Sequence, residues 1–306
     1  MTAGSALRVP LLGAEAYMSP ERLELERVAV LDDAWVPVAP VDTLAEPGAY
    51  ATVQAGRTPL LVMRGQDGVL RAFVNMCRHR GMALLERCGS TGSAVVCPYH
   101  AWRFSTDGTL KVIPQRATQF AGVDPADWGL LPASVGTWDG LVLASAAEGR
   151  ALRVLQGQVP PPRTGPALRE VGAFAVEGAF NWKLLVERSG DVAAVLPDLL
   201  LLRRPEGLCS RVVVPVAPDR SRVEVRVWAD PGPAADRLVA TERAALEQCV
   251  AACEGAQRAL VSGTPPARDP GNGLVAAFHD RLLSRTTGPR TPRPGTVETR
   301  VTEDAR

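Results

Sequence analysis

The chain has 306 residues, which is enough for two compact domains with a core each. Its formal net charge is +1, and no block of like charges stands out, which argues against nucleic acid or an anionic membrane surface as the main partner. The longest apolar run, VAAVLPDLLLL, is interrupted by Pro197 and Asp198 and falls short of the roughly 20 residues that span a bilayer. We therefore expect a cytoplasmic protein without a membrane partner, in which cysteines are metal ligands or core residues.

Residues 41–147 contain short runs of Val, Leu and Phe, such as TPLLVMRG, LRAFVNM and GLVLAS. The turn sequences QDG at 66–68 and TDG at 106–108 separate such runs. This pattern predicts a meander of short antiparallel strands, and hence an all-β unit. Residues 1–40 are expected to form an N-terminal segment that packs on the second domain.

A linker is predicted over residues 148–168, because three successive prolines at 160–162 prevent regular structure. The second unit is predicted over residues 169–284. The residues after it, 285–306, are rich in Thr, Pro, Arg and Gly and are predicted to be disordered.

Two elements of the second unit can be predicted from their periodicity. Residues 221–229 alternate valines with charged residues, which is typical of a half-exposed strand. Residues 241–262 carry an apolar stripe at helical spacing that ends before Gly263, and they predict a helix.

Two of the three histidines and two of the six cysteines alternate as Cys77, His79, Cys97 and His100. Structural zinc sites usually pair sulfur with sulfur across a short spacing and nitrogen with nitrogen across another. Here each short loop carries one sulfur and one nitrogen, which favours a cluster of two inequivalent irons, with thiolates on one iron and imidazoles on the other. Zinc and a chance arrangement are the alternatives.

The segments CRHRG and CPYHAW resemble the Rieske [2Fe-2S] domain of Rieske non-haem iron oxygenases, and the resemblance extends over residues 14–145. Respiratory Rieske proteins have a disulfide cysteine in each loop where this chain has Met82 and Tyr99, so the loops are similar to the oxygenase type. The chain departs from the family at Ala101, where Gly is usual. Trp102 is expected either to tune the cluster or simply to pack under the loop.

The resemblance implies an α+β fold: an all-β Rieske domain followed by a shortened, helix-grip-like domain with an antiparallel sheet and a C-terminal helix. It also implies that Cys77, His79, Cys97 and His100 bind a [2Fe-2S] cluster.

The second domain of the resembled family holds a mononuclear iron between two histidines and a carboxylate. The family's motif is matched here at Asn181, Trp182, Lys183, Glu187 and Asp191. The histidine positions then fall on Ala194 and Leu199, or their segment is deleted, and the position of the third ligand holds Gln248 or Cys249. We therefore predict that the mononuclear iron is absent.

Three further residues are candidates for a role. His279 is expected at the surface or on a helix face, and Cys249 and Cys253 are expected to be core thiols rather than metal ligands. Asp191 either makes an inter-subunit electron bridge to a neighbour's cluster histidine, as the resemblance implies, or is a solvated loop residue.

The resemblance favours an electron-transfer subunit of a ring-like hetero-oligomeric oxygenase. Such a subunit would accept electrons from a reductase or ferredoxin and pass them to a catalytic Rieske oxygenase subunit. The alternatives are a stand-alone electron carrier or redox sensor, an oxidoreductase with an unrecognised active site, and a structural partner whose cluster only stabilises folding.

Overall fold

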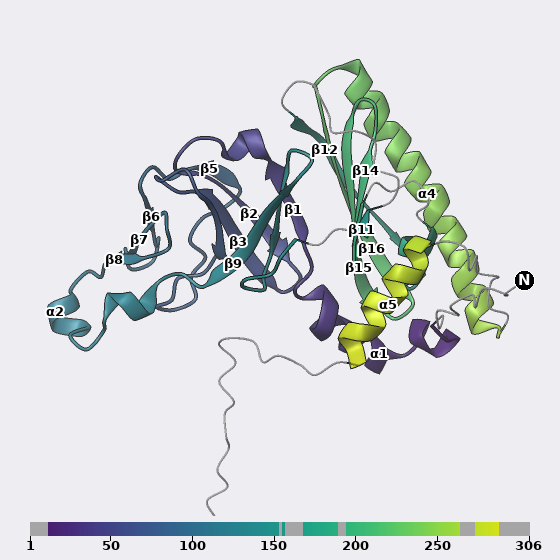
Figure 1. The fold of residues 1–306 in the computed structure, drawn as a ribbon, viewed down its shortest axis with the longest axis horizontal. Coiled ribbons are helices and arrows are strands. Elements are labelled where there is room, and N and C mark those ends of the chain that lie inside the picture. Colours follow the sequence, from purple (N-terminus) through teal and green to yellow (C-terminus); the bar gives the residue numbers. More distant parts are fainter. Residues whose placement is uncertain (1–11, 153–154, 157–167, 189–193, 264–272, 288–306) are drawn as a thin grey trace, which may run out of the picture.

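The structure is a computed structural model that describes residues 12–152, 155–156, 168–188, 194–263 and 273–287. Two units lie side by side in it, an all-β unit and a unit in which helices cover a sheet (Figure 1). Among the described residues, no helix combines the length and the apolar character that crossing a membrane would need.

The first unit is built from antiparallel strands in two sheets. Its larger sheet has seven strands in the order β1-β10-β9-β4-β3-β2-β5. Their bounds are Val36–Pro40 (β1), Ala49–Ala55 (β2), Thr58–Arg64 (β3), Leu70–Val74 (β4), Cys88–Ser90 (β5), Pro132–Trp138 (β9) and Leu141–Ser145 (β10). The smaller sheet consists of Ala94–Val96 (β6), Arg103–Ser105 (β7) and Leu110–Val112 (β8).

Strand β3 explains why this unit contains continuous apolar runs. Successive side chains of a strand point to opposite faces, so the side chains of TPLLVMR pack alternately in two different apolar clusters. Leu60 and Val62 pack in one apolar cluster, whereas Leu61 and Met63 pack in the cluster that also contains Cys77 and Cys97. The small sheet and the short helix α2 (Arg116–Gln119) lie at the end of the molecule farthest from the second unit (Figure 1).

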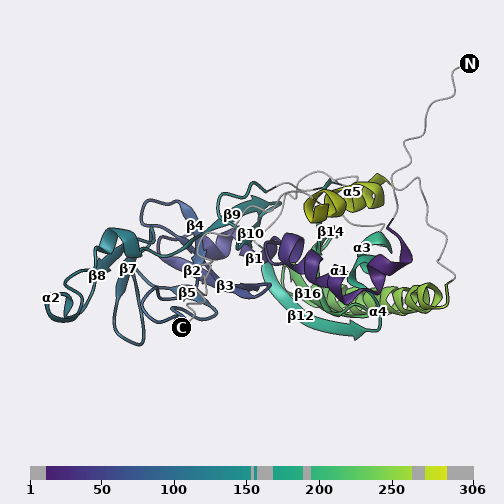
Figure 2. The same cartoon turned by 90° about the horizontal axis from the view of Figure 1, so that it is seen from below.

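The second unit contains a six-stranded antiparallel sheet in the order β11-β13-β14-β15-β16-β12. Its strands are Leu155–Gln156 (β11), Arg169–Gly178 (β12), Ala194–Leu196 (β13), Leu199–Arg203 (β14), Gly207–Ala217 (β15) and Arg220–Ala229 (β16). The long helix α4 (Pro233–Val261) runs along one face of this sheet (Figure 2). In β16, Val223, Val225 and Val227 are buried in the core that α4 covers, as the alternation predicted.

Shorter helices complete the second unit. They are α1 (Pro20–Glu26), α3 (Trp182–Arg188) and α5 (Gly273–Thr287), and the turns η1 (Ala14–Tyr17) and η2 (Arg27–Leu31) flank α1. Residues from these elements join the core beneath α4, so the N-terminal segment packs on the second unit as far as Leu31.

Several element limits differ from the sequence prediction. Strand β1 (36–40) pairs with β10 in the first unit, although it lies within the range assigned to the N-terminal segment. Strand β11 lies within the predicted linker but pairs with β13. Helix α4 begins at Pro233, eight residues before the predicted start, and α5 extends to Thr287, into the predicted tail. Residues 160–162 and 288–306 lie outside the described residues.

The two units share an apolar contact that includes Trp35 and Leu143 from the first unit and Leu201 and Trp228 from the second. The guanidinium of Arg226 also donates to the backbone oxygens of Pro37 and Val38, each at 2.9 Å. The sheet of the second unit is thereby anchored to β1.

Candidate iron–sulfur site

Cys77 and Cys97 begin two loops that are closed by the same backbone hydrogen bonds. The carbonyl of Cys77 accepts from Gly81 N at 2.9 Å, and its N–H donates to Met82 O at 2.8 Å. The carbonyl of Cys97 accepts from Ala101 N at 3.1 Å, and its N–H donates to Trp102 O at 2.9 Å. Both cysteines therefore have the same turn around them.

The fourth residue after each cysteine has a left-handed backbone, with φ of 71° at Gly81 and 55° at Ala101. Gly adopts this conformation without strain, whereas a side chain at Cβ makes it unfavourable. The departure at Ala101 therefore leaves the turn intact but strains it.

Asn75 holds the first loop in place from the end of β4. Its side-chain oxygen accepts from Leu84 N and Leu85 N, each at 3.2 Å, and its amide nitrogen donates to Leu85 O at 2.8 Å. Asn75 is buried, so these bonds satisfy a polar group that would otherwise be costly.

The four predicted ligands come together in two pairs. The thiols of Cys77 and Cys97 are buried next to each other, close enough that Cys97 raises the cost of ionising Cys77. The rings of His79 and His100 lie edge to face with their centroids 4.6 Å apart, and both are half-buried. The arrangement therefore places sulfur inside and nitrogen outside, as expected for two inequivalent irons.

The chemistry of these donors fits a Rieske cluster. Burial and the neighbouring His100 lower the pKa of His79, which favours the neutral imidazole that binds metals, whereas burial raises the pKa of the Cys77 thiol to about 11, so metal binding there would release its proton. Nδ1 of His79 is buried without a hydrogen-bond partner. No three His, Cys, Asp or Glu residues of the described part of the chain form a group suited to one metal ion. A Rieske centre needs no such group, because each iron takes only two protein ligands.

Trp102 is almost fully buried, and its ring is stacked on His79 with centroids 5.0 Å apart and planes 3° from parallel. Phe120 approaches both rings edge-on. Trp102 therefore packs under the loop and contacts a predicted ligand, while its role in tuning the cluster stays a prediction.

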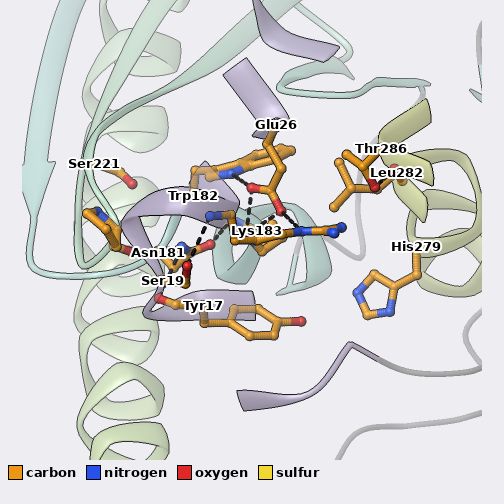
Figure 3. Close-up of polar contacts among 12 residues, drawn as sticks. Tyr17, Ser19, Glu26, Asn181, Trp182, Lys183, Ser221, His279, Leu282 and Thr286 are labelled. Atoms are coloured by element: carbon orange, nitrogen blue, oxygen red, sulfur yellow. Dashed lines mark hydrogen bonds and ion pairs between the residues drawn. The ribbon is translucent and has the colours of Figure 1, made fainter. Parts of the chain in front are cut away.

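The matched motif in the second unit forms a buried polar network instead (Figure 3). The Glu26 carboxylate accepts from Lys183 Nζ at 2.8 Å and from Trp182 Nε1 at 2.9 Å, and it pairs with Arg22 Nε at 3.0 Å. Glu26 and Lys183 are fully buried. Asn181 caps this end of α3, because its side-chain oxygen accepts from Lys183 N at 3.1 Å.

His279 is on a helix face but fully buried, so the expectation of a surface position was wrong. Its Nε2 is 2.8 Å from Oε1 of Glu187, which also accepts a hydrogen bond from the Tyr17 hydroxyl. His279 is buried because α5 packs against α3 and α1, from which it is distant in sequence.

The remaining candidates are distributed as follows. Cys253 is buried in the core and shares a hydrogen bond with the half-buried Cys249, while Gln248 is exposed. Leu199 is buried in β14, and Ala194 is the first residue of β13. Asp191 lies outside the described residues.

The buried Glu26 was missed from the sequence. It lies three residues after Leu23 and four before Val30, and both of these are buried. An acid on an apolar stripe at helical spacing was the signal for a buried charge.

Residues 34–131 match the family model of the Rieske [2Fe-2S] domain. The chain is 31% identical over 179 residues to a carnitine monooxygenase oxygenase subunit of Acinetobacter pittii, covering 56% of this chain and 47% of that protein. It is 36% identical over 127 residues to a benzene 1,2-dioxygenase subunit alpha of Pseudomonas putida, covering 42% and 28% of the two chains. The sequence matches thus span about half or less of these relatives.

Solved structures have the same fold over a longer range. A quaternary ammonium Rieske monooxygenase in complex with L-carnitine is 20% identical, covers 90% of this chain and 95% of its own, and has a TM-score of 0.66. Naphthalene 1,2-dioxygenase with bound indole is 16% identical, with coverages of 90% and 92% and a TM-score of 0.62. A further quaternary ammonium Rieske monooxygenase structure, described as revealing inter-subunit electron transfer, is 21% identical, with coverages of 89% and 94% and a TM-score of 0.64. These similarities confirm the predicted α+β fold class, in which an all-β Rieske domain is joined to a domain with an antiparallel sheet and helices.

Proposed function

Because this chain carries a Rieske [2Fe-2S] domain and is homologous to Rieske oxygenase alpha subunits, we propose that it is an electron-transfer subunit of a hetero-oligomeric oxygenase. The observation that carries the proposal is the pairing of two buried thiols beside two half-buried imidazoles. Cys77 and Cys97 would hold one iron, and His79 and His100 the other. The bound cluster supplies one-electron transfer.

The surrounding residues would keep this site ready for electron exchange. The two cysteines are buried, which keeps water from the sulfur side, while the histidines are partly exposed. Trp102 fixes the ring plane of His79 by stacking on it. An electron donor of the reductase or ferredoxin class would therefore dock on the histidine side, at the far end of the first unit.

We also propose that the chain has no mononuclear iron of its own. Among the described residues near the matched motif, Nε2 of His279 is engaged with Glu187 and Cys253 lies against Cys249, which leaves Nδ1 of His279 as a buried nitrogen without a partner. The electron acceptor would then be a catalytic Rieske oxygenase subunit in a ring-like hetero-oligomer. The inter-subunit electron transfer described for a solved relative supports this arrangement.

A second candidate function is that of an oxygenase in its own right. The curated relatives are named as monooxygenase and dioxygenase subunits. The buried group of Tyr17, Glu187 and His279 is the set of oxygen and nitrogen donors that this candidate would use.

Iron and acid-labile sulfide, measured per chain on anaerobically purified protein together with an EPR spectrum of the reduced state, test both candidates. We expect about two irons and two sulfides with a Rieske-type signal. The Cys77→Ser variant should lose the iron and sulfide together with the EPR signal. The Cys88→Ser variant, at an exposed cysteine, should keep all of them. Zinc in place of iron would overturn the cluster proposal, and a reproducible third iron would favour the oxygenase.

Subunit function is tested by mixing the protein with an intact Rieske oxygenase whose own cluster ligands have been replaced. Product formation with a reductase should return only when both proteins are present, and the Cys77→Ser variant should not support it. If the two proteins never associate, the subunit proposal fails, and a stand-alone carrier remains.

Asp191 is proposed as the inter-subunit bridge in this assembly. Asp191→Asn should therefore slow the restored reaction and leave the iron content unchanged. An equal rate for the variant and the parent would assign Asp191 to the solvated loop instead.

A further inference from the structure

A cavity of about 650 Å³ lies between the two units. Val36 and Val53 line it from the first unit, and Ser210, Val212 and Val214 of β15 line it from the second. Small-molecule sites usually have volumes of about 300–1,000 Å³ and mostly apolar walls. The cavity is therefore large enough for a ligand.

The cavity is separate from the features described above. Cys209 and Val213 of β15 pack in the core beneath α4, and side chains alternate along a strand. Ser210, Val212 and Val214 therefore point to the opposite face of the sheet. The cavity is thus on the side turned toward the first unit, away from α4 and from the cysteine–histidine loops.

Two buried polar atoms on the cavity wall have no hydrogen-bond partner among the described residues. They are Oδ1 of Asp198, in the turn between β13 and β14, and Oγ of Ser210. Asp198 is 6% exposed and Ser210 is fully buried. The turn is fixed, because Val213 N donates to the Asp198 backbone oxygen at 2.8 Å. Buried polar groups are rarely left unpaired, because burial without a partner costs free energy.

Apart from Asp198, the charged residues that line the cavity are already paired. Arg222 contacts Glu224 at 3.2 Å, Arg226 contacts Glu170, Arg57 contacts Asp32, and Arg27 donates to the Pro215 oxygen at 2.8 Å. In the part of the chain that the structure describes, the polar groups of the cavity wall that still lack a hydrogen-bond partner are therefore those of Asp198 and Ser210. An ionised carboxylate only accepts hydrogen bonds, so its partner must carry an N–H or O–H group.

We propose that this cavity binds a small, largely apolar molecule whose one polar end is an amine or hydroxyl that donates to Asp198 and contacts Ser210. The cavity walls would enclose the apolar part, and the two units would hold the ligand between them. This site goes beyond the electron-transfer role and does not depend on it.

Three probes that share a phenyl ring on a butyl chain and differ in the terminal group test the proposal: phenylbutanol, phenylbutylamine and phenylbutyrate. Calorimetry and saturation-transfer NMR on the full-length protein at pH 8 should show that the alcohol or the amine binds. The carboxylate should bind at least about tenfold more weakly, since it offers no donor. Which of the two donor probes is preferred identifies the polar group.

Variants place the binding in this cavity. Asp198→Asn and Ser210→Ala should each lower the affinity for the preferred probe by about tenfold, which corresponds to the loss of one hydrogen bond to a charged or buried group. Cys209→Ala is the matched control, because Cys209 is on the same strand but faces α4, and it should bind as the parent does. Val214→Trp, at a partly exposed wall residue, should block all probes.

The proposal is wrong if no probe binds, if the carboxylate binds as well as the donors, or if Val214→Trp leaves binding unchanged. In the first case the two polar atoms would be satisfied by water alone. Iron content measured on the same samples should not change, so a failure here is distinguishable from a failure of the cluster proposal.

Discussion

The cysteine–histidine loops of the first unit and the Glu26 network of the second unit differ in how their buried polar groups are satisfied. In the cysteine–histidine loops, Nδ1 of His79 is buried without a hydrogen-bond partner among the described residues, and the two buried thiols lie next to each other. In the second unit, Glu26, Lys183 and Trp182 satisfy one another across segments far apart in sequence. Groups that lack partners point to a ligand, whereas groups that satisfy one another serve the fold. By this criterion the cysteine–histidine loops bind the cofactor, whereas Trp182 and Lys183 of the matched motif serve packing.

The largest loss of stability is expected at the buried ion pair of Glu26 and Lys183. Lys183→Met should lower the free energy of unfolding by about 3 kcal/mol, because it removes the buried cation of the Glu26 carboxylate and leaves only Arg22 to pair with it. Urea unfolding measures this change. Arg71→Met, which removes the partner of the exposed Asp67, should cost less than about 1 kcal/mol. Similar losses in both variants would contradict a structural role for the Glu26 network.

Asp198 is expected to make the stability of the protein depend on pH, with a change of intermediate size. Burial raises its pKa to about 7, although its own backbone amide and Arg150 act in the opposite direction. The folded protein therefore binds a proton that the unfolded chain has lost, and the stability of the parent falls as pH rises from about 4 to 7.

Asp198→Asn removes this titration. The stability of the variant relative to the parent should therefore increase by roughly 2–3 kcal/mol between pH 5 and pH 8. Urea unfolding at the two pH values provides the measurement. If the difference in the free energy of unfolding between variant and parent were the same at both pH values, Asp198 would be ionised in the folded state throughout this range.

The smallest expected change in stability concerns the two matching turns of the first unit, at Ala101 and Gly81. Ala101→Gly should stabilise the protein by up to about 1 kcal/mol, because it relieves a left-handed backbone. Gly81→Ala should destabilise it by about the same amount, since its new Cβ would meet only Met76 Sδ at 3.5 Å and Cγ at 3.9 Å, and only the backbone conformation is penalised. Thermal unfolding of both variants tests the pair, and changes of the same sign would refute the equivalence of the two loops.

Local patterns in the sequence were sufficient where neighbouring residues decide the structure. The alternation in β16 and the spacing of the cysteine–histidine pairs needed only short windows of sequence. Burial of His279 could not be predicted in this way, because it depends on the packing of α5 against α3. The same holds for Ser210, whose face of the sheet becomes a cavity wall only when the two units meet. The places of β1 and β11 differ from the prediction because a strand's membership is decided by its pairing partner, which lies far away in sequence for both strands.

The matching backbone turns at Cys77 and Cys97 have a consequence for how the protein is made. Each turn is closed by its own amides and carbonyls, and Asn75 braces the first one, so hydrogen bonds within the protein help to define the shape of both loops. Small zinc domains, in contrast, fold only when the metal binds. We expect the newly synthesised chain to fold before maturation and to receive its cluster as a preformed receptor, with iron supply limiting its activity rather than its abundance.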